Sequence, residues 1–342
     1  MTRLSRRMHI APQVLIVDGL SGSGKAAVSP VLLGFDRVEN VLVRYIFEYL
    51  CCANHFGRMA DDAVESLIRL LTDVASYDNS ISREVNLRPS DLTCALKTHL
   101  SAKYLERLFL PDGKAAQRRI EKEIPILHLM THQVFGMSAP IFRALGKRLT
   151  FVKAVRHPLT MLSYQVNYME RYGADQTDFT VWIDHDGRDL PWFARGHEKL
   201  FLKSKTMDRV IYSLKWMLEQ EAETLANFPK EYKKRMVILP FEKFVKDPEP
   251  YLSRLEGVLD TTRLPILKEI LKAQRIPRDV ANAGPDSAGI WRARYGLKDP
   301  GKGATDASEL QNMWSEAREK ASPQALAVLQ KICGDYERIH LS

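Results

Sequence analysis

Short apolar runs alternate with longer stretches of helical periodicity along this chain of 342 residues. Apolar positions at helical spacing predict helices over 41–75, 91–110 and 207–227, and two amphipathic helices from Glu309 onward. Short, mainly apolar runs are typical of strands buried on both faces of a parallel sheet, and four fit this description: Val14–Val17, Ile126–Leu129, Leu149–Val155 and Met236–Leu239. The alternation predicts an α/β fold with a doubly wound, mainly parallel sheet and flanking helices.

One segment breaks this alternation. Residues 175–205 contain Trp182, His185 and Trp192 among glycine, proline and acidic residues. They predict an inserted lid or small subdomain, within a single domain that spans residues 1–342. Two roles stay open for its aromatic residues: they line an acceptor pocket, or they form the small core of the lid itself.

A glycine-rich loop follows the first predicted strand. The stretch from Gly19 to Ala26, GLSGSGKA, fits the pattern Gly-x-x-x-x-Gly-Lys and precedes a helix-like segment. Such a loop turns backbone N–H groups toward a phosphate, and its lysine neutralises phosphate oxygens. The alternative is a glycine-rich turn with a solvated lysine. We expect phosphate contacts from six residues of this loop: Ser21, Gly22, Ser23, Gly24, Lys25 and Ala26.

The residue after the lysine bears on the need for a metal. Nucleotide-hydrolysing loops place serine or threonine there to hold magnesium. This chain has Ala26 instead, which favours a phosphate loop that works without magnesium.

The third predicted strand ends at Arg156, and Pro158 opens the helix that follows. Ser163 lies about two turns along that helix. Arg156 and Ser163 are therefore candidates to bind one phosphate, one from the edge of the sheet and the other from the helix. The alternative is an arginine in a surface ion pair beside a serine that faces the helix.

These pieces, in their order and spacing, make the chain similar to the PAPS-dependent sulfotransferases. Four further pieces carry the resemblance: Thr131-His132 after the second strand, the helix-like stretch from Arg209 to Trp216, the segment from Leu239 to Pro248 with Glu242, and Gly289-Ile-Trp291-Arg292. The resemblance implies transfer of a sulfuryl group from PAPS to a hydroxyl or amine, leaving adenosine 3′,5′-bisphosphate. It also implies a 3′-phosphate site at Arg156 and Ser163, and a small-molecule or carbohydrate acceptor.

The sequence departs from the family pattern in three places. Ser163 follows Arg156 by seven residues, where the family usually has eight. The loop reads Gly-Ser-Gly-Lys where the family has Lys-Ser-Gly-Thr-Thr or Arg-Ser-Gly-Thr-Thr. The Arg-Lys-Gly motif of the family has no clear match, and four residues are candidates to replace it: Arg278, Arg292, Arg294 and Lys298.

Sulfuryl transfer needs a base for the acceptor and a cation at the departing phosphate oxygen. Lys25 suits the cation. His132, at the end of a strand, is the first candidate for the base. Carbohydrate-type members of the family use a glutamate soon after the loop as the base. By resemblance to them, Glu39 or Glu48 is the reserve candidate for the base. We expect Glu242 to act as a cap or ion-pair partner.

Composition adds constraints on ligand and location. Lysine and arginine exceed aspartate and glutamate by eight, which suits an anionic ligand. The basic residues are dispersed, so a small anion is favoured over nucleic acid. No apolar run reaches the length of a membrane helix, the four cysteines are expected to be reduced and mostly buried, and the expected location is the cytoplasm.

Two other functions stay open at this stage. One is a P-loop kinase that phosphorylates a small molecule with ATP and magnesium; Ala26 counts against it, and the Gly-Ser-Gly-Lys sequence favours it. The other is a nucleotide-binding protein without catalysis. The sulfotransferase interpretation requires Lys25 and Arg156 to converge on opposite ends of one doubly phosphorylated adenosine, with no metal.

Overall fold

The computed structural model describes residues 2–91, 93–176, 178–280 and 305–342. Its main sheet has five strands in the order β2-β3-β1-β4-β7, and all four neighbouring pairs are parallel. The strands are β1 (Gln13–Asp18), β2 (Leu42–Val43), β3 (Ile126–Met130), β4 (Leu149–Val155) and β7 (Met236–Pro240). The predicted α/β fold with a mainly parallel sheet is therefore confirmed.

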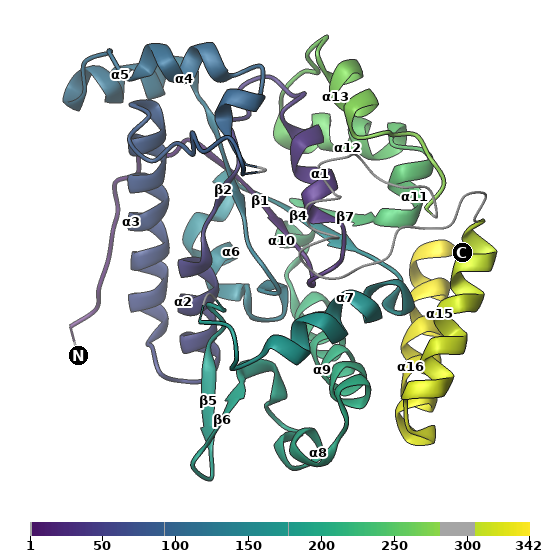
Figure 1. The fold of residues 1–342 in the computed structure, drawn as a ribbon. Helices are drawn as coiled ribbons and strands as arrows, with labels where there is room; N and C mark the ends of the chain where they lie inside the picture. The colour runs from purple at the N-terminus through teal and green to yellow at the C-terminus, as the bar shows by residue number, and fades with distance from the viewer. Residues whose placement is uncertain (1, 92, 177, 281–304) are drawn as a thin grey trace.

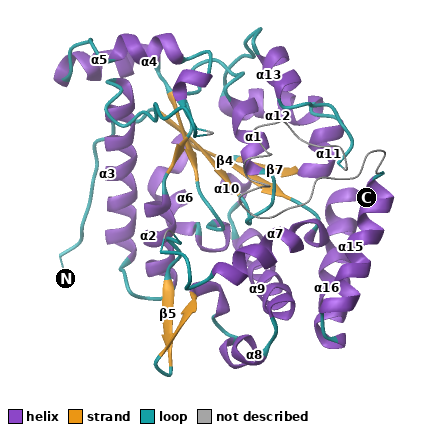
Figure 2. Cartoon of the chain, viewed as in Figure 1, coloured by secondary structure: helices purple, strands orange, loops and turns teal. Residues whose placement is uncertain are grey.

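Helices cover both faces of this sheet (Figures 1 and 2). Helices that contribute buried residues to the core on one face include α2 (Tyr45–His55), α3 (Asp61–Ser80), α6 (Ala139–Leu145), α7 (Pro158–Arg171), α9 (Thr206–Asn227) and α16 (Pro323–Tyr336). The other face carries α1 (Lys25–Leu32), α11 (Phe241–Lys246), α12 (Glu249–Leu259) and α13 (Leu267–Ala273). The remaining helices of the described residues are α4 (Ser101–Arg107), α5 (Gly113–Glu123), α8 (Glu198–Lys203), α10 (Lys230–Lys233) and α15 (Asp306–Lys320).

Continuous burial explains why the strands could be found in the sequence. Every residue of β3 and of β4 is buried, as expected for strands with helices on both sides. Strand β2 was not predicted, because it has only two residues and lies in a stretch that we predicted as helix. At that length a strand has no periodicity of its own.

The segment 175–205 forms a two-stranded antiparallel hairpin, β5 (Trp182–His185) and β6 (Arg188–Pro191), followed by a short 3₁₀ turn and α8. In Figure 1 the hairpin projects away from the main sheet beneath α2. Its role as a lid over the acceptor stays a prediction.

The C-terminal helices α15 and α16 stand side by side at one edge of the molecule, next to α7 (Figure 1). A π-helical turn over Glu337–Leu341 extends α16. Among the described residues, no helix combines the length and apolar character needed to cross a membrane. All four cysteines are buried and have free thiols, as predicted.

Candidate active site

The glycine-rich loop joins the end of β1 to the start of α1, and two of its glycines are required by its shape. Gly22 and Gly24 have φ angles of 88° and 94°, a region that side chains other than glycine rarely adopt. A Cβ atom on Gly24 would also lie 2.3 Å from the ring of Phe241. The backbone therefore turns tightly against Phe241, and helix α1 begins at the next residue.

Lys25 folds back over the loop that precedes it. Its Nζ atom donates to the carbonyl oxygens of Gly19 at 2.5 Å and Leu20 at 3.5 Å, and the residue is 6% exposed. Burial lowers the pKa of Lys25, while the nearby carboxylates of Asp18, Glu48 and Glu221 act in the opposite direction. The ammonium group thus lies inside the loop, among carboxylates.

Arg156 reaches the same loop from the neighbouring strand. It follows the last residue of β4, which pairs with β1, and its Nη1 atom donates to the carbonyl oxygen of Gly22 at 3.2 Å. Its guanidinium group lies 4.5 Å from the centre of the Phe241 ring. Because parallel strands end at the same edge of a sheet, Lys25 and Arg156 come together from positions 131 residues apart in the sequence.

The other predicted loop residues differ in exposure. Ser21 is buried, and its carbonyl oxygen accepts from Nε2 of Gln165 at 2.7 Å. Ser23 is 1% exposed, and its Oγ, within the described part of the chain, has no hydrogen-bond partner. Its backbone N–H donates to Leu20 at 3.0 Å. Ala26 is exposed in the first turn of α1, so its backbone lies on the accessible side.

Helix α7 contacts the loop through a face that excludes Ser163. A Cβ atom on Gly22 would lie 3.5 Å from Tyr164 and 3.6 Å from Met161, and Gln165 holds the carbonyl of Ser21. At about 100° per residue, Ser163 lies roughly 150° around the helix from the centre of that face. Ser163 therefore points away from the loop, and the residue eight positions after Arg156, Tyr164, faces it.

His132 is bonded to Glu48, one of the two glutamates named above as reserve candidates for the base. Glu48 Oε1 accepts from the backbone N–H of His132 at 2.7 Å and lies 3.1 Å from Nδ1 of its ring. The ring of Tyr45 stacks on the imidazole, with centroids 5.2 Å apart. Burial, and then the charge of Lys25, lowers the pKa of His132 well below its ordinary value. The imidazole is therefore neutral at pH 7.

Asp18, at the end of β1, was not singled out in the sequence. Its carboxylate accepts from the hydroxyl of Thr131 at 2.8 Å and from the backbone N–H groups of Val134 and Phe135 at 3.2 and 3.0 Å. These bonds fix the turn after β3, which carries His132. The signal in the sequence that could have identified Asp18 is an acidic residue at the end of a buried apolar strand.

Lys153 and Glu221 form a buried ion pair under this edge, 2.7 Å long. Lys153 lies in β4 beside Asp18, and its ammonium also sits over the ring of Phe135, 4.4 Å from the centroid. Burial raises the pKa of Glu221, and Lys153 opposes that shift. Neither residue was predicted, because an isolated lysine in a strand gives no indication of its partner.

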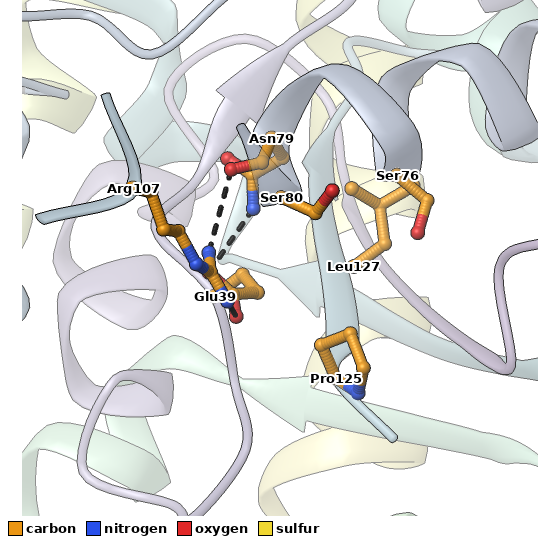
Figure 3. A pocket seen from close by; sticks show the side chains of 7 residues that line it. All are labelled: Glu39, Ser76, Asn79, Ser80, Arg107, Pro125 and Leu127. Carbon is orange, nitrogen blue, oxygen red and sulfur yellow. Dashed lines mark hydrogen bonds and ion pairs between the residues drawn. The ribbon is translucent and has the colours of Figure 1, made fainter. Parts of the chain in front are cut away.

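Glu39 lies elsewhere, beside the amino-terminal half of β3 (Figure 3). Its carboxylate receives hydrogen bonds from Arg107 at 2.8 and 3.0 Å, Lys103 at 2.9 Å and the Tyr104 hydroxyl at 2.5 Å. Burial alone would raise the pKa of Glu39, but these cations and donors, Arg107 first, bring it to about 2. Glu39 is thus a fully engaged anion at the end of the sheet away from the loop.

The cavity next to Glu39 is small. It measures about 10 Å³ and is lined by Ser76, Asn79, Ser80, Arg107, Pro125 and Leu127, beside Glu39 (Figure 3). A space of this size holds at most one water molecule. It has no room for an acceptor or a nucleotide.

The aromatic residues of segment 175–205 divide into two groups. Trp192 and Phe193 are buried in the main core, and Trp192 contacts Trp216 edge-on at 5.8 Å. Phe179 is 60% exposed and lies 6.1 Å from Tyr45, the residue that stacks on His132. Trp192 therefore belongs to the main core, which is neither of the two roles left open by the sequence, and the exposed rings near His132 are those of Phe179 and Tyr45.

Of the candidates to replace the Arg-Lys-Gly motif, Arg292, Arg294 and Lys298 lie outside the described residues. Arg278 lies within them, with its guanidinium 5.6 Å from the centre of the Phe241 ring that also carries Arg156. Glu242 accepts from the backbone N–H of His157 at 2.9 Å, at the start of α7, in the capping role expected for it.

Solved structures match this chain at low sequence identity. One is the sulfotransferase domain from the curacin biosynthetic pathway, at 12% identity and a TM-score of 0.43, covering 97% of this chain and 99% of that one. Another is the sulfotransferase domain from the Synechococcus PCC 7002 olefin synthase, at 13% identity and 0.45, covering 98% of each chain. A mouse sulfotransferase complexed with PAP matches at 10% identity and 0.37, covering 96% of this chain and 90% of that one.

Each of these three proteins is a sulfotransferase. No family model matches the sequence, and no curated protein matches it. Among the described residues, no three His, Cys, Asp or Glu side chains are grouped so as to hold a metal ion.

Proposed function

We propose that this protein transfers a sulfuryl group from PAPS to the hydroxyl or amine of a small molecule or carbohydrate, leaving adenosine 3′,5′-bisphosphate. The observation that carries the proposal is the meeting of Lys25 and Arg156 on one loop, 2.5 Å from the Gly19 carbonyl and 3.2 Å from the Gly22 carbonyl. A nucleotide phosphorylated at both ends needs two cations at separate points.

The loop has the features that a phosphate requires. Gly22 and Gly24 supply the tight turn, α1 points its amino-terminal end at the loop, and Gly24 at the N-cap position has no side-chain cap. Backbone N–H groups and the helix dipole favour an anion at such a place. The buried Oγ of Ser23, unpaired among the described residues, offers a further donor beneath the loop.

In the proposed reaction each residue has one task. The acceptor oxygen forms a bond to sulfur while the bond from sulfur to the 5′-phosphate oxygen breaks, and its electron pair stays on that oxygen. The proton of the acceptor passes to the imidazole of His132. Lys25 stabilises the charge that develops on the phosphate, and Arg156 binds the 3′-phosphate. Glu39 takes no part, because it is saturated with donors at the other end of the sheet.

Ligand-induced thermal stabilisation tests the proposal. Adenosine 3′,5′-bisphosphate and PAPS should raise the melting temperature without any metal, and [³⁵S]PAPS should label an acceptor from a panel of phenols, aliphatic alcohols, amines and monosaccharides. Stabilisation by ATP with magnesium alone would instead indicate a kinase. Binding of adenosine 3′,5′-bisphosphate without any labelled acceptor would favour a non-catalytic nucleotide-binding protein.

Two variants locate the two ends of the nucleotide. Arg156→Ala should weaken binding of adenosine 3′,5′-bisphosphate by about tenfold to a hundredfold, corresponding to ~1.5–3 kcal/mol for a charged hydrogen bond. Lys25→Ala should lower the rate of transfer by orders of magnitude; because Lys25 is buried and bonded to two carbonyl oxygens, it should also lower the melting temperature, so rates are compared at a temperature where both proteins are folded. Lys215→Ala, which removes an exposed lysine of α9, is the matched control. Normal affinity in the Arg156 variant would refute the assignment of the 3′-phosphate.

A further inference from the structure

Glu48 and His132 form a pair whose geometry is defined by two contacts to a single oxygen. Oε1 of Glu48 lies 2.7 Å from the backbone nitrogen and 3.1 Å from Nδ1 of the same histidine. The ring of Tyr45, also from α2, stacks on the imidazole at an interplanar angle of 17°. The backbone, the ring edge and the ring face of His132 are therefore all held by one helix.

This arrangement decides which ring nitrogen carries the hydrogen. The backbone N–H can only donate, so Oε1 is an acceptor in that contact. The same oxygen accepts most readily from an Nδ1–H group, because a neutral imidazole has one donor and one acceptor nitrogen. With the hydrogen on Nδ1, the lone pair lies on Nε2.

We propose that Glu48 is a positioning residue: it fixes the tautomer and the orientation of His132 so that Nε2 receives the proton of the acceptor. The inference rests on the proposed function for its catalytic meaning, but the tautomer itself is a property of the protein alone. During transfer the O–H bond of the acceptor breaks and an Nε2–H bond forms. The carboxylate of Glu48 then balances the charge of the imidazolium.

The exposed fractions of the His132 and Glu48 side chains favour His132, rather than Glu48, as the base. The side chain of His132 is 27% exposed, whereas that of Glu48 is 17% exposed. Oε1 of Glu48 is already engaged with two groups of His132. The ring is thus the more accessible member of the pair, and it lies on the side where Tyr45 and Phe179 are exposed.

The surroundings of the pair determine its response to pH. Burial raises the pKa of Glu48, and Asp18 of β1 adds to the rise; the N–H of His132 and the ammonium of Lys25 oppose it. Tyr49 and Cys52 lie on the same helix as Glu48, and Glu221 of α9 faces Lys25. His132 stays neutral because its own pKa is lowered. The active form, with Glu48 ionised, is therefore lost as the pH falls through the raised pKa of Glu48.

Nuclear magnetic resonance of the full chain, with ¹⁵N-labelled histidine, tests the tautomer directly. The protein has nine histidines, and the resonances of His132 are those that disappear in His132→Asn. We expect protonated Nδ1 and unprotonated Nε2 at neutral pH, and loss of this preference in Glu48→Ala. Protonated Nε2 in the unmodified protein would overturn the inference, whether or not the protein binds PAPS.

Kinetics with the labelled acceptor give the second measurement. Glu48→Gln keeps an oxygen for the two N–H groups, so the fold and the orientation of His132 should persist. It removes the negative charge that balances the imidazolium, and should therefore lower kcat by roughly a hundredfold. Its affinity for adenosine 3′,5′-bisphosphate should be unchanged. The acid limb of its rate profile should move to lower pH, because the group with the raised pKa is gone. Glu84→Gln, which removes an exposed carboxylate paired with Arg44, is the matched control.

A double variant separates the two roles. If Glu48 acts through His132, Glu48→Gln combined with His132→Asn should be no slower than His132→Asn alone. Additive losses would show that Glu48 acts independently of His132, and nearly full activity in His132→Asn would show that His132 is not the base; either result would refute the inference. Neither result would affect transfer from PAPS itself, which is refuted only if PAPS does not bind or is not used, but nearly full activity in His132→Asn would remove His132 as the base of the proposed reaction.

Discussion

At the scale of single residues, the direction of a side chain matters more than its position in a motif. Ser163 has the residue type expected for a phosphate contact, yet its place on α7 turns it away from the loop. Tyr164 lies against Gly22, and Gln165 holds the carbonyl of Ser21. We infer that Tyr164 supplies the hydroxyl that the resemblance assigned to Ser163.

Substitution at the two neighbouring positions tests this assignment. Tyr164→Phe should weaken binding of adenosine 3′,5′-bisphosphate by roughly 0.5–1.5 kcal/mol, the value of one hydrogen bond, while keeping the ring against Gly22. Ser163→Ala should leave the affinity unchanged. Isothermal titration calorimetry measures both. A loss of affinity in the Ser163 variant alone would restore the original assignment.

The difference between the position of a side chain and its direction also explains which parts of the site could be predicted from the sequence. Lys25 and Arg156 were found because each follows a strand that its own apolar run reveals, and parallel strands bring their ends together. Choosing between Glu39 and Glu48 requires knowing where the chain runs beside β3. That path includes β2, whose two residues show no periodicity in the sequence. The sequence therefore predicts the cations, whereas the partner of His132 requires the tertiary structure.

At the scale of elements, the end of α16 supports the turn that carries Arg156. Glu242 of α11 accepts from the His157 N–H at 2.9 Å and from the Tyr336 hydroxyl at 2.5 Å. The His157 ring lies 3.0 Å from the carboxylate of Glu337 and edge-on to Tyr336. Burial and Glu242 raise the pKa of Tyr336, so its hydroxyl stays protonated and can donate.

Tyr336→Phe removes that one donor and keeps the ring on His157. The lost hydrogen bond to a charged group is worth about 1.5–3 kcal/mol. Part of it should appear as a lower melting temperature. Part should appear as weaker binding of adenosine 3′,5′-bisphosphate, because the turn next to Arg156 is held less firmly. Lys331→Ala, which removes an exposed lysine on the same helix, should change neither. Unaltered nucleotide affinity in Tyr336→Phe would show that the contact serves stability alone.

At the scale of the whole molecule, the two ends of the sheet have different tasks. The carboxyl end carries the loop, Arg156 and His132, whereas Glu39, Arg107, Lys103 and Tyr104 form a closed cluster towards the other end. Arg107 is also bonded to Glu123 of α5 at 3.0 Å. This cluster joins the strand region before β2 to α4 and α5, and we assign it to stability.

Glu39→Gln should therefore destabilise the protein without altering nucleotide affinity. Removing one partner of a buried ion pair costs about 3–5 kcal/mol, which urea denaturation can measure. The pH dependence follows from the pKa of about 2 for Glu39. Because the folded value lies below the ordinary one, the stabilisation is complete above about pH 4.5 and is lost as the pH falls toward 2. Loss of transfer activity in a fully folded Glu39→Gln protein would contradict this assignment.

The support that α16 gives to Arg156 joins distant parts of the chain, since His157 and Glu337 are 180 positions apart and Glu242 and Tyr336 are 94 apart. A nascent polypeptide emerges from its amino terminus, and its early segments begin to fold before the late ones exist. β1, the glycine-rich loop and β4 are therefore synthesised long before the helix that steadies their arginine. If the proposed nucleotide site depends on this support, we expect it to bind tightly only after α16 has been synthesised.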